Sequence, residues 1–294
     1  MASTLGKGRD HRFEGKVARP PNPEYVEQLS LTVRTCIENK REAISTVRIV
    51  TWNIRAGGGQ RVDRIAKRLA RWRPDLVVLC EFRGTPPSRQ LAARLAARGL
   101  AHQKTSVAED QPTQNALLIA SRWPLQSRAT RDAPKDLRRW LPVRVLAPAP
   151  FDLGAMHIPN RVSGRKDDFY TGVTNVAARW RRRPAILIGD TNTGWPQLDE
   201  EVPCFGPREE NFLDGMTGLG WADAFRHLRG SARAYTWYSP NGGNGFRLDQ
   251  AFVSSLLSPR LLRASYLWGS RRRGALSDHA ALIVDLAELA PAAS

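Results

Sequence analysis

Short apolar runs alternate with amphipathic segments rich in arginine and alanine along most of this chain, from about residue 47 onward. Many of the apolar runs are β-branched and strand-length, and several have no polar position, which predicts strands buried on both faces. We expect strands at 47–52, 76–80, 116–120, 143–146, 153–156, 185–188, 236–238, 248–253 and 280–286. We expect helices at about 61–72, 88–98, 167–182 and 209–219. This alternation indicates one mixed α/β domain over residues 47–294.

A different pattern precedes that domain. Residues 1 to about 22 are polar and basic and end at Pro20-Pro21, which is typical of an arm or linker. Apolar residues then recur at helical spacing between residues 24 and 44: Tyr25, Leu29, Val33, Cys36 and Ile37. We therefore expect residues 1–46 to form a basic N-terminal extension with one helix.

The charge of the chain restricts its partners. The sequence has 45 Lys and Arg against 28 Asp and Glu, a net charge of +17. Such a field attracts polyanions, so nucleic acid is the first expected partner, with a phosphorylated small molecule or an anionic membrane surface as alternatives. Arginine runs such as Arg181-Arg182-Arg183 and Arg271-Arg272-Arg273 fit this, because the guanidinium fork matches phosphate oxygens.

Cysteine usage and hydropathy indicate the compartment. Cys36, Cys80 and Cys204 are an odd number without CxxC spacing, so neither a disulfide framework nor a zinc site is predicted. No apolar stretch reaches the length of about 18 residues that a membrane span needs, and the N-terminus lacks a signal-type apolar core. We expect a cytoplasmic protein with no membrane span and no obligate protein partner.

Polar side chains that can carry chemistry stand at the ends of the expected strands. They are Asn53, Glu81, His157, Asp190 and Asn192 after strands, and Asp249 and Asp278-His279 at or before the start of strands. If the strands that end in these residues run in one direction, and the strands that begin at them run antiparallel to those, all these groups would lie at one rim of the fold.

Oxygen donors dominate that set. Carboxylates and amides with few nitrogens and no thiolates favour Mg²⁺ or Mn²⁺ over Zn²⁺. With His157 and His279 as titratable partners, the set suits metal-assisted attack of water on a phosphodiester or a phosphomonoester. Taken singly, each residue also has a structural interpretation: Asp190 as a helix or turn cap, Glu81 as an ion pair with a neighbouring arginine, His157 as a buried imidazole.

The motifs that contain these residues resemble, in sequence and order, those of the endonuclease/exonuclease/phosphatase superfamily, which includes exonuclease III-like and DNase I-like metal-dependent nucleases. They are Thr51-Trp52-Asn53-Ile54, Val78-Leu79-Cys80-Glu81, Met156-His157-Ile158-Pro159-Asn160, Ile188-Gly189-Asp190-Thr191-Asn192, Arg247-Leu248-Asp249-Gln250 and Ser277-Asp278-His279. The resemblance implies a four-layered α/β sandwich, with two mixed β-sheets packed face to face and flanked by helices.

The resemblance also implies roles for the site residues. Glu81 looks like the principal metal ligand for Mg²⁺ or Mn²⁺, with Asn53 and Asp278 in or near the same coordination shell. Asp190 looks like the residue that orients or deprotonates the attacking water, and Asn192 like a holder of that water or of the phosphate.

Two histidines complete the implied catalytic set. His279, supported by Asp249, looks like the phosphate-binding histidine, and either Asp190 or His279 is the base. His157 stands where repair nucleases of the superfamily usually carry tyrosine, and it is more similar to the DNase I-like and phosphatase branches, where a histidine can serve the leaving group.

Substrate contacts are expected from three further residues. Trp237 lies in a segment similar to exonuclease III-type nucleases, in which an aromatic residue lines a base pocket; it can also be a core tryptophan. Arg55 and Arg247 flank the metal and histidine motifs and supply guanidinium groups.

The leading hypothesis is therefore a Mg²⁺-dependent phosphodiesterase, most consistent with a DNA nuclease, either an endonuclease or an exonuclease. The alternative is a phosphatase or phosphodiesterase that acts on a small-molecule or lipid-linked phosphate, favoured by His157. A third class, a catalytically silent nucleic-acid-binding protein, is disfavoured because every expected site position is filled.

Overall fold

Two six-stranded mixed β-sheets form the centre of the molecule. The computed structural model describes residues 46–161, 164–270 and 275–288. The helix expected at 24–44 and the run Arg271-Arg272-Arg273 lie outside the described residues.

The first sheet has the strand order β13-β14-β1-β2-β4-β3. Its strands are β1 (Thr46–Asn53), β2 (Leu76–Phe82), β3 (His102–Thr105), β4 (Ala116–Ser121), β13 (Leu261–Leu267) and β14 (Ala281–Ala287). Strand β1 is parallel to β2 and antiparallel to β14. The first two strands therefore end at the same rim at which β14 begins.

The second sheet has the order β5-β6-β7-β8-β12-β9. Its strands are β5 (Leu125–Ser127), β6 (Trp140–Val145), β7 (Phe151–His157), β8 (Ala185–Asp190), β9 (Ala222–Asp223) and β12 (Asp249–Val253). Strand β8 is parallel to β7 and antiparallel to β12. A separate hairpin pairs β10 (Trp237–Tyr238) with β11 (Gly245–Phe246).

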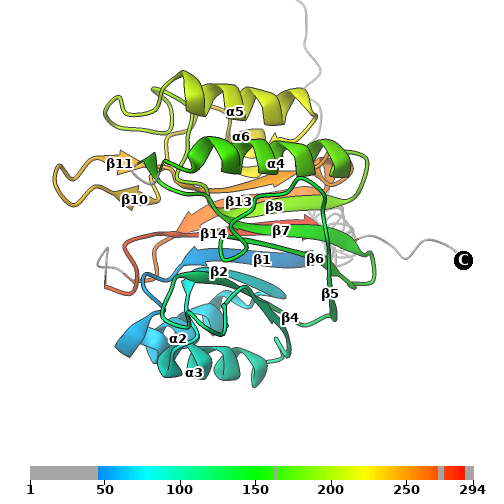
Figure 1. The fold of residues 1–294 in the computed structure, drawn as a ribbon, viewed down its shortest axis with the longest axis vertical. Helices are drawn as coiled ribbons and strands as arrows, with labels where there is room; N and C mark the ends of the chain where they lie inside the picture. Colours follow the sequence, from blue (N-terminus) through cyan, green and yellow to red (C-terminus); the bar gives the residue numbers. More distant parts are fainter. Residues whose placement is uncertain (1–45, 162–163, 271–274, 289–294) are drawn as a thin grey trace, which may run out of the picture. The chain divides into compact units, whose positions relative to one another are not determined.

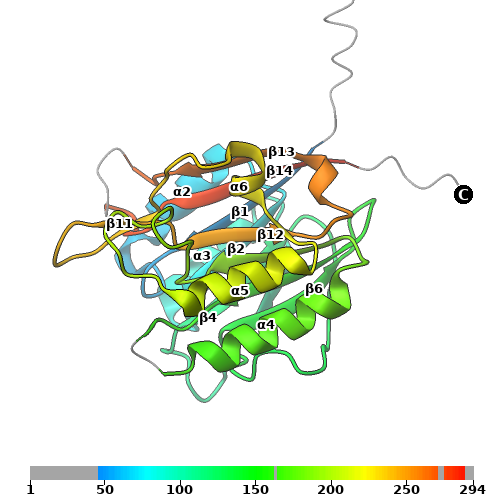
Figure 2. The ribbon, with the colours of Figure 1, turned by 90° about the horizontal axis from the view of Figure 1, so that it is seen from above.

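Helices α2 (Val62–Trp72), α3 (Pro86–Ala96), α4 (Lys166–Trp180) and α5 (Pro207–Gly218) cover the outer faces of the sheets (Figures 1 and 2). The short helix α6 (Ala224–Arg229) packs against the layer between the sheets, and two 3₁₀ turns are η1 (Gly59–Arg61) and η3 (Ser258–Arg260). Helices α2 and α3 pack on the first sheet, and α4 and α5 on the second. In the described ranges, no helix is both long and apolar enough to cross a membrane.

Three apolar layers hold the sandwich together. The central one lies between the sheets and includes Ile49, Val78, Leu153, Ile186 and Val253. The outer two join each sheet to its helices, through residues such as Trp52 and Leu69 on one side and Leu187 and Phe212 on the other. Successive strand residues alternate between these layers, since side chains of a strand point to opposite faces in turn. The expected four-layered α/β sandwich is confirmed.

Every expected strand and helix of the 47–294 domain has a counterpart, with ends displaced by a few residues. Elements that were not predicted are β3, β5, β9, β11, β13 and α6. Most are too short to show a period, and β3 is a polar edge strand. In β13, full burial is confined to Leu261 and Ala264, so the apolar signal is weak.

Candidate active site

The polar groups of the site continue the apolar stripe between the two sheets. Ile186 and Ile188 of β8 face the opposite sheet, and strand alternation turns Asp190, the last residue of β8, to the same side. His157 in β7 and Asp249 in β12 are the register partners of Asp190. Three titratable side chains therefore stand side by side where the inter-sheet core ends.

Asp190 is the centre of this group. Its carboxylate is buried, with 2% of the residue surface exposed. Oδ2 accepts a hydrogen bond from Asn53 Nδ2 at 2.9 Å, and it lies 3.5 Å from His157 Nε2 and 3.9 Å from His279 Nε2. Asn53 ends β1 of the first sheet, so this one oxygen joins the two sheets at the rim.

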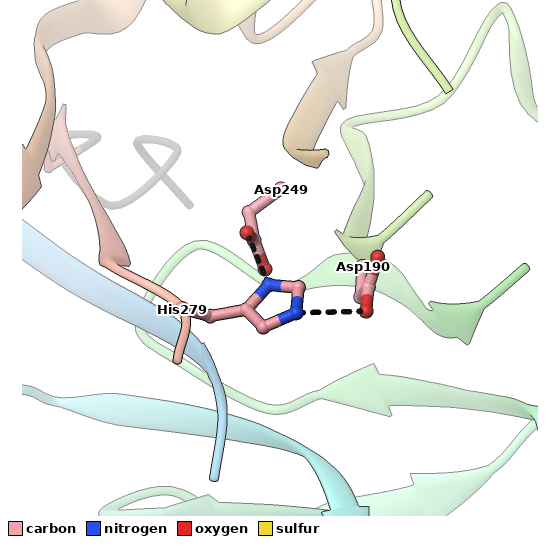
Figure 3. A group of neighbouring side chains, drawn as sticks. All are labelled: Asp190, Asp249 and His279. Carbon is pink, nitrogen blue, oxygen red and sulfur yellow. Dashed lines mark hydrogen bonds and ion pairs between the residues drawn. The ribbon is translucent and has the colours of Figure 1, made fainter. Parts of the chain in front are cut away.

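Asp249 and His279 form a hydrogen-bonded pair behind Asp190. His279 Nδ1 and Asp249 Oδ2 are 2.9 Å apart, while Nε2 of the same ring faces Asp190 (Figure 3). The backbone of His279 is fixed by Trp52, whose indole Nε1 donates to the His279 carbonyl oxygen at 2.9 Å. Ser277 Oγ accepts from the His279 N–H at 3.1 Å and donates to the Asn53 carbonyl oxygen at 2.5 Å.

The two histidines differ in their tendency to carry charge. Burial lowers the pKa of His157 to about 4, with Asp190 opposing the shift and Arg139 adding to it. Burial also disfavours the charged form of His279, but the charges of Asp249 and Asp190 outweigh it and raise its pKa to about 10. At neutral pH the site thus holds one neutral imidazole and one imidazolium.

Burial raises the pKa of Asp190, although His279, His157 and the Asn53 hydrogen bond favour its ionised form. A carboxylate whose pKa is raised binds a proton more readily, as a group that accepts one from water requires.

Glu81 reaches the site through a break in β2. The pairing of β2 with β4 shifts between Cys80 and Phe82, and Glu81 has a left-handed φ of 58°. Non-glycine residues seldom adopt this conformation, and such bulges re-aim a side chain. The carboxylate accepts from Asn53 Nδ2 at 3.1 Å and from the Ala56 N–H at 2.7 Å.

Asp278 is connected to Glu81 through the charge of Arg61. The Arg61 guanidinium donates to the carbonyl oxygens of Leu276 and Arg55. Burial and the charge of Arg55 lower the pKa of Arg61, whereas Asp278 and Glu81 act in the opposite sense. Both carboxylates are therefore within electrostatic reach of one guanidinium.

The donor set fits a hard divalent cation. Each Glu81 oxygen accepts only one hydrogen bond from the described residues, so lone pairs remain for a ligand. Asp249 Oδ1 is buried and has no hydrogen-bond partner among the described residues. Ligand atoms of Asp190, Asp249 and His279 also lie within 4.8 Å of one another, but Asp249 favours the protonated form of His279, which has no lone pair for a metal. A site so rich in carboxylate oxygens suits Mg²⁺ or Mn²⁺.

Asn192 follows Asp190 in a tight turn with a left-handed φ of 46°. Its N–H donates to Asp190 Oδ1 at 3.1 Å, and its Nδ2 donates to the Ile158 carbonyl oxygen at 2.8 Å. Lys166, 1% exposed, supports the turn from behind: Nζ donates to the Asn192 carbonyl oxygen at 2.7 Å and to Glu209 at 2.9 Å. No local sequence pattern indicates this role, because Lys166 lies in a charged stretch that is typical of solvated surface.

The residues expected to bind substrate are placed differently from one another. Arg55 is exposed, and its backbone N–H donates to Asn53 Oδ1 at 2.9 Å. Trp237 is half-buried, with its ring centroid 6.4 Å from that of His279 and 6.0 Å from that of Phe246. Both border the site.

Arg247 does not. It is fully buried, and its guanidinium donates to Asp199 through two bonds of 2.7 Å, to Asp223 at 2.7 Å and to Tyr266 at 3.2 Å. The expectation of a substrate contact is wrong, because Arg247, in the link between β11 and β12, is fully buried and its donors are engaged. Tyr266 in turn donates to the Asp249 carbonyl oxygen at 2.8 Å, so Arg247 belongs to the support of the site.

Residues 50–279 match the Endonuclease/Exonuclease/phosphatase family. The chain belongs to this family. The family confirms the resemblance seen in the sequence and makes the protein a metal-dependent phosphoric ester hydrolase, with a divalent metal as cofactor. No curated protein matches the chain significantly.

Solved structures share the fold of this family member. A 3′-5′ exonuclease from Neisseria meningitidis is 23% identical, with a TM-score of 0.67 over 82% of this chain and 99% of that one. A Neisseria 3′ phosphatase bound to a product DNA hairpin is 22% identical, with a TM-score of 0.65 over 82% and 99%. An AP endonuclease from Archaeoglobus fulgidus is 20% identical, with a TM-score of 0.69 over 81% and 98%.

The buried Arg247 network yields a stability prediction for this enzyme. Replacing Arg247 by Met leaves the Asp223 carboxylate buried without its cation and leaves Asp199 with Arg226 alone, and should lower the free energy of unfolding by about 3–5 kcal/mol at pH 7. Burial raises the pKa of Asp199, but Arg247 and Arg226 together hold it below 3.8. This contribution is present above pH 3.8 and is lost as the pH falls through the folded-state pKa.

Urea unfolding at several pH values measures the effect, and the difference between Arg247→Met and wild type should shrink below pH 3.8. The matched control is Arg122→Met, which breaks the exposed pair with Asp75 and should cost about 0–1 kcal/mol. Equal, small losses in the two variants would show that the buried network does not support the domain.

Proposed function

We propose that this protein is a Mg²⁺-dependent DNA nuclease that hydrolyses phosphodiester bonds by direct attack of water. The observation that carries the proposal is the Asp190 carboxylate, buried and held between Asn53, His157 and His279 beside Glu81. Such a carboxylate can orient a water molecule and accept its proton.

Glu81, Asn53 and Asp278 are the residues that would hold the metal. When bound, the metal would neutralise charge on the phosphate oxygens, make phosphorus easier to attack and favour ionised Asp190, the form that accepts a proton.

The protein side chains supply the rest of the chemistry. Asp190 takes the proton of the attacking water, and Asn192 holds that water or a phosphate oxygen. His279, charged through its bond to Asp249, donates to the phosphate and stabilises the negative charge that develops there. His157, neutral and 3.5 Å from Asp190, would receive the proton that Asp190 takes from water and pass it to the leaving oxygen.

DNA as the substrate is supported by charge and by the fold neighbours. The net charge of +17 favours a polyanion over a small phosphate ester. The neighbours include an exonuclease, AP endonucleases and a phosphatase bound to a DNA hairpin. Arg55 at the opening would contact backbone phosphates, and Trp237 beside His279 would stack on a base. A cytoplasmic location remains a prediction from the sequence.

A phosphatase is the second candidate, favoured by His157. A neutral imidazole next to Asp190 can also serve the leaving group of a monoester, and one fold neighbour is a 3′ phosphatase. The substrate then would be a terminal phosphate of DNA or a small phosphorylated molecule.

A substrate panel tests the proposed function. Purified protein with Mg²⁺ or Mn²⁺ should cleave supercoiled plasmid, linear duplex or an abasic-site duplex, and a chelator should abolish cleavage. Phosphate monoesters, including DNA with a 3′ phosphate, form the second arm. Inactivity on every internal DNA linkage together with turnover of a monoester would reject the nuclease in favour of the phosphatase.

Variants of the site should lose activity and retain the fold. Asp190→Asn removes the proton acceptor and His279→Ala removes the phosphate donor, so each should lower kcat by about 10²–10⁴-fold. Circular dichroism and thermal unfolding verify folding, and Asp214→Asn on the exposed side of α5 is the matched control. Near-wild-type turnover by either site variant would refute the assigned chemistry.

A further inference from the structure

Leu137 is the most exposed large apolar side chain of the described residues, with 72% of its surface accessible. It lies in the connection between β5 and β6, three residues before Trp140. One exposed leucine is ordinary on a protein surface. The residues around Leu137, however, indicate that its exposure serves a function.

The turn that carries Leu137 is fixed. The Arg139 N–H donates to the Asp136 carbonyl oxygen at 3.0 Å, and the Arg138 N–H donates to Asp136 Oδ1 at 3.2 Å. Ser106 Oγ donates to the Arg138 carbonyl oxygen at 2.8 Å. Both residues that follow Leu137 are thus tied down, so its exposure is imposed by the fold.

This turn is joined to the catalytic centre. The His157 N–H donates to the Arg139 carbonyl oxygen at 2.9 Å, and Arg139 Nη1 donates to the His157 carbonyl oxygen at 3.3 Å. His157 is the residue that lies 3.5 Å from Asp190. Leu137 therefore stands on the catalytic rim, on its His157 side.

Leu137 lines a hollow of about 500 Å³, a volume that suits a bound ligand. Pro159 and the mostly buried Phe169 give it further apolar surface. Lys135 and Arg165 are exposed cations on its wall, and the part of the chain described here places no acidic side chain within ion-pair distance of either. Two acids also line it: Asp136, which is paired with Arg138 and Arg139, and Asp168, which can accept a hydrogen bond from an amino group of a base.

We propose that this hollow is a nucleotide subsite, which binds a nucleotide of the substrate strand next to the scissile phosphodiester. Leu137 packs against the face of the base, and Lys135 and Arg165 contact the neighbouring phosphates. The inference rests on the proposed nucleic-acid substrate. Apolar side chains on rigid supports commonly insert beside bases, while nearby cations bind the backbone.

The test uses the full-length protein and an oligonucleotide duplex. In the inactive Asp190→Asn background, Leu137→Ala should weaken DNA binding about tenfold, measured by fluorescence anisotropy. In the active protein the same change should raise KM for DNA about tenfold with kcat maintained. Leu137→Met keeps an apolar contact and should restore most of the affinity.

Leu256→Ala is the matched control, because Leu256 is 50% exposed but follows the far end of β12 from Asp249. Lys135→Ala should reduce the slope of log affinity against log salt by about one, and Lys67→Ala on the outer face of α2 should not. Affinity and KM of Leu137→Ala equal to those of Leu256→Ala would overturn the subsite and leave a protein partner as the reason for the exposed leucine.

The outcomes separate the two proposals. DNA binding that depends on Leu137, in a protein that hydrolyses only monoesters, keeps the subsite and rejects the nuclease. DNA cleavage that is indifferent to Leu137 keeps the nuclease and rejects the subsite. A protein that does not bind DNA rejects both.

Discussion

Burying the Asp190 carboxylate at the end of the inter-sheet core costs free energy that only donors and cations close to it can offset. These come from separate parts of the chain: Asn53 from the first sheet, His157 from the neighbouring strand, and His279 from the segment before β14. Each must be brought to one point, so the register of both sheets and the packing between them are tied to a single buried charge. Burial also raises the pKa of Asp190, so that the carboxylate binds a proton more readily.

The carboxylate of Glu81, unlike that of Asp190, is partly exposed. It lies on a strained left-handed residue at a break in β2, and the Arg55–Gly59 segment closes over it with further left-handed residues. Strain of this kind persists where the surrounding structure imposes it, and it commonly marks a functional position. Two carboxylates bridged by one Asn53 amide therefore have distinct environments, which suits one to hold a metal and the other to handle water.

The sequence predicted the convergence of the site because polar residues at strand ends follow a simple rule of alternation. His157 and Asp190 each extend an apolar stripe by one strand step, and Asn53 follows Ile49 and the buried Thr51 at the same spacing. Arg247 was misjudged, since its sequence neighbours lie in the site while its own side chain points into a buried ion-pair network. The supporting contacts of Lys166, and of Ser277 in the Ser277-Asp278-His279 motif, were not predicted because they join residues far apart in the chain. The exposure of Leu137 was not predicted because it depends on the folded chain. Local pattern thus predicts which residues meet, and tertiary contacts decide which of them are supports.

We propose that Glu81 holds the metal and that Asp190 takes the proton of the attacking water. The position of the metal tests this central claim most directly. Crystals of the wild-type protein and of Glu81→Gln, soaked with Mn²⁺, would give anomalous difference maps. We expect a peak beside the Glu81 carboxylate, bounded by Asn53 and Asp278, and we expect that peak to be lost in Glu81→Gln. A peak confined to Asp190, Asp249 and His279, with none at Glu81, would contradict the claim.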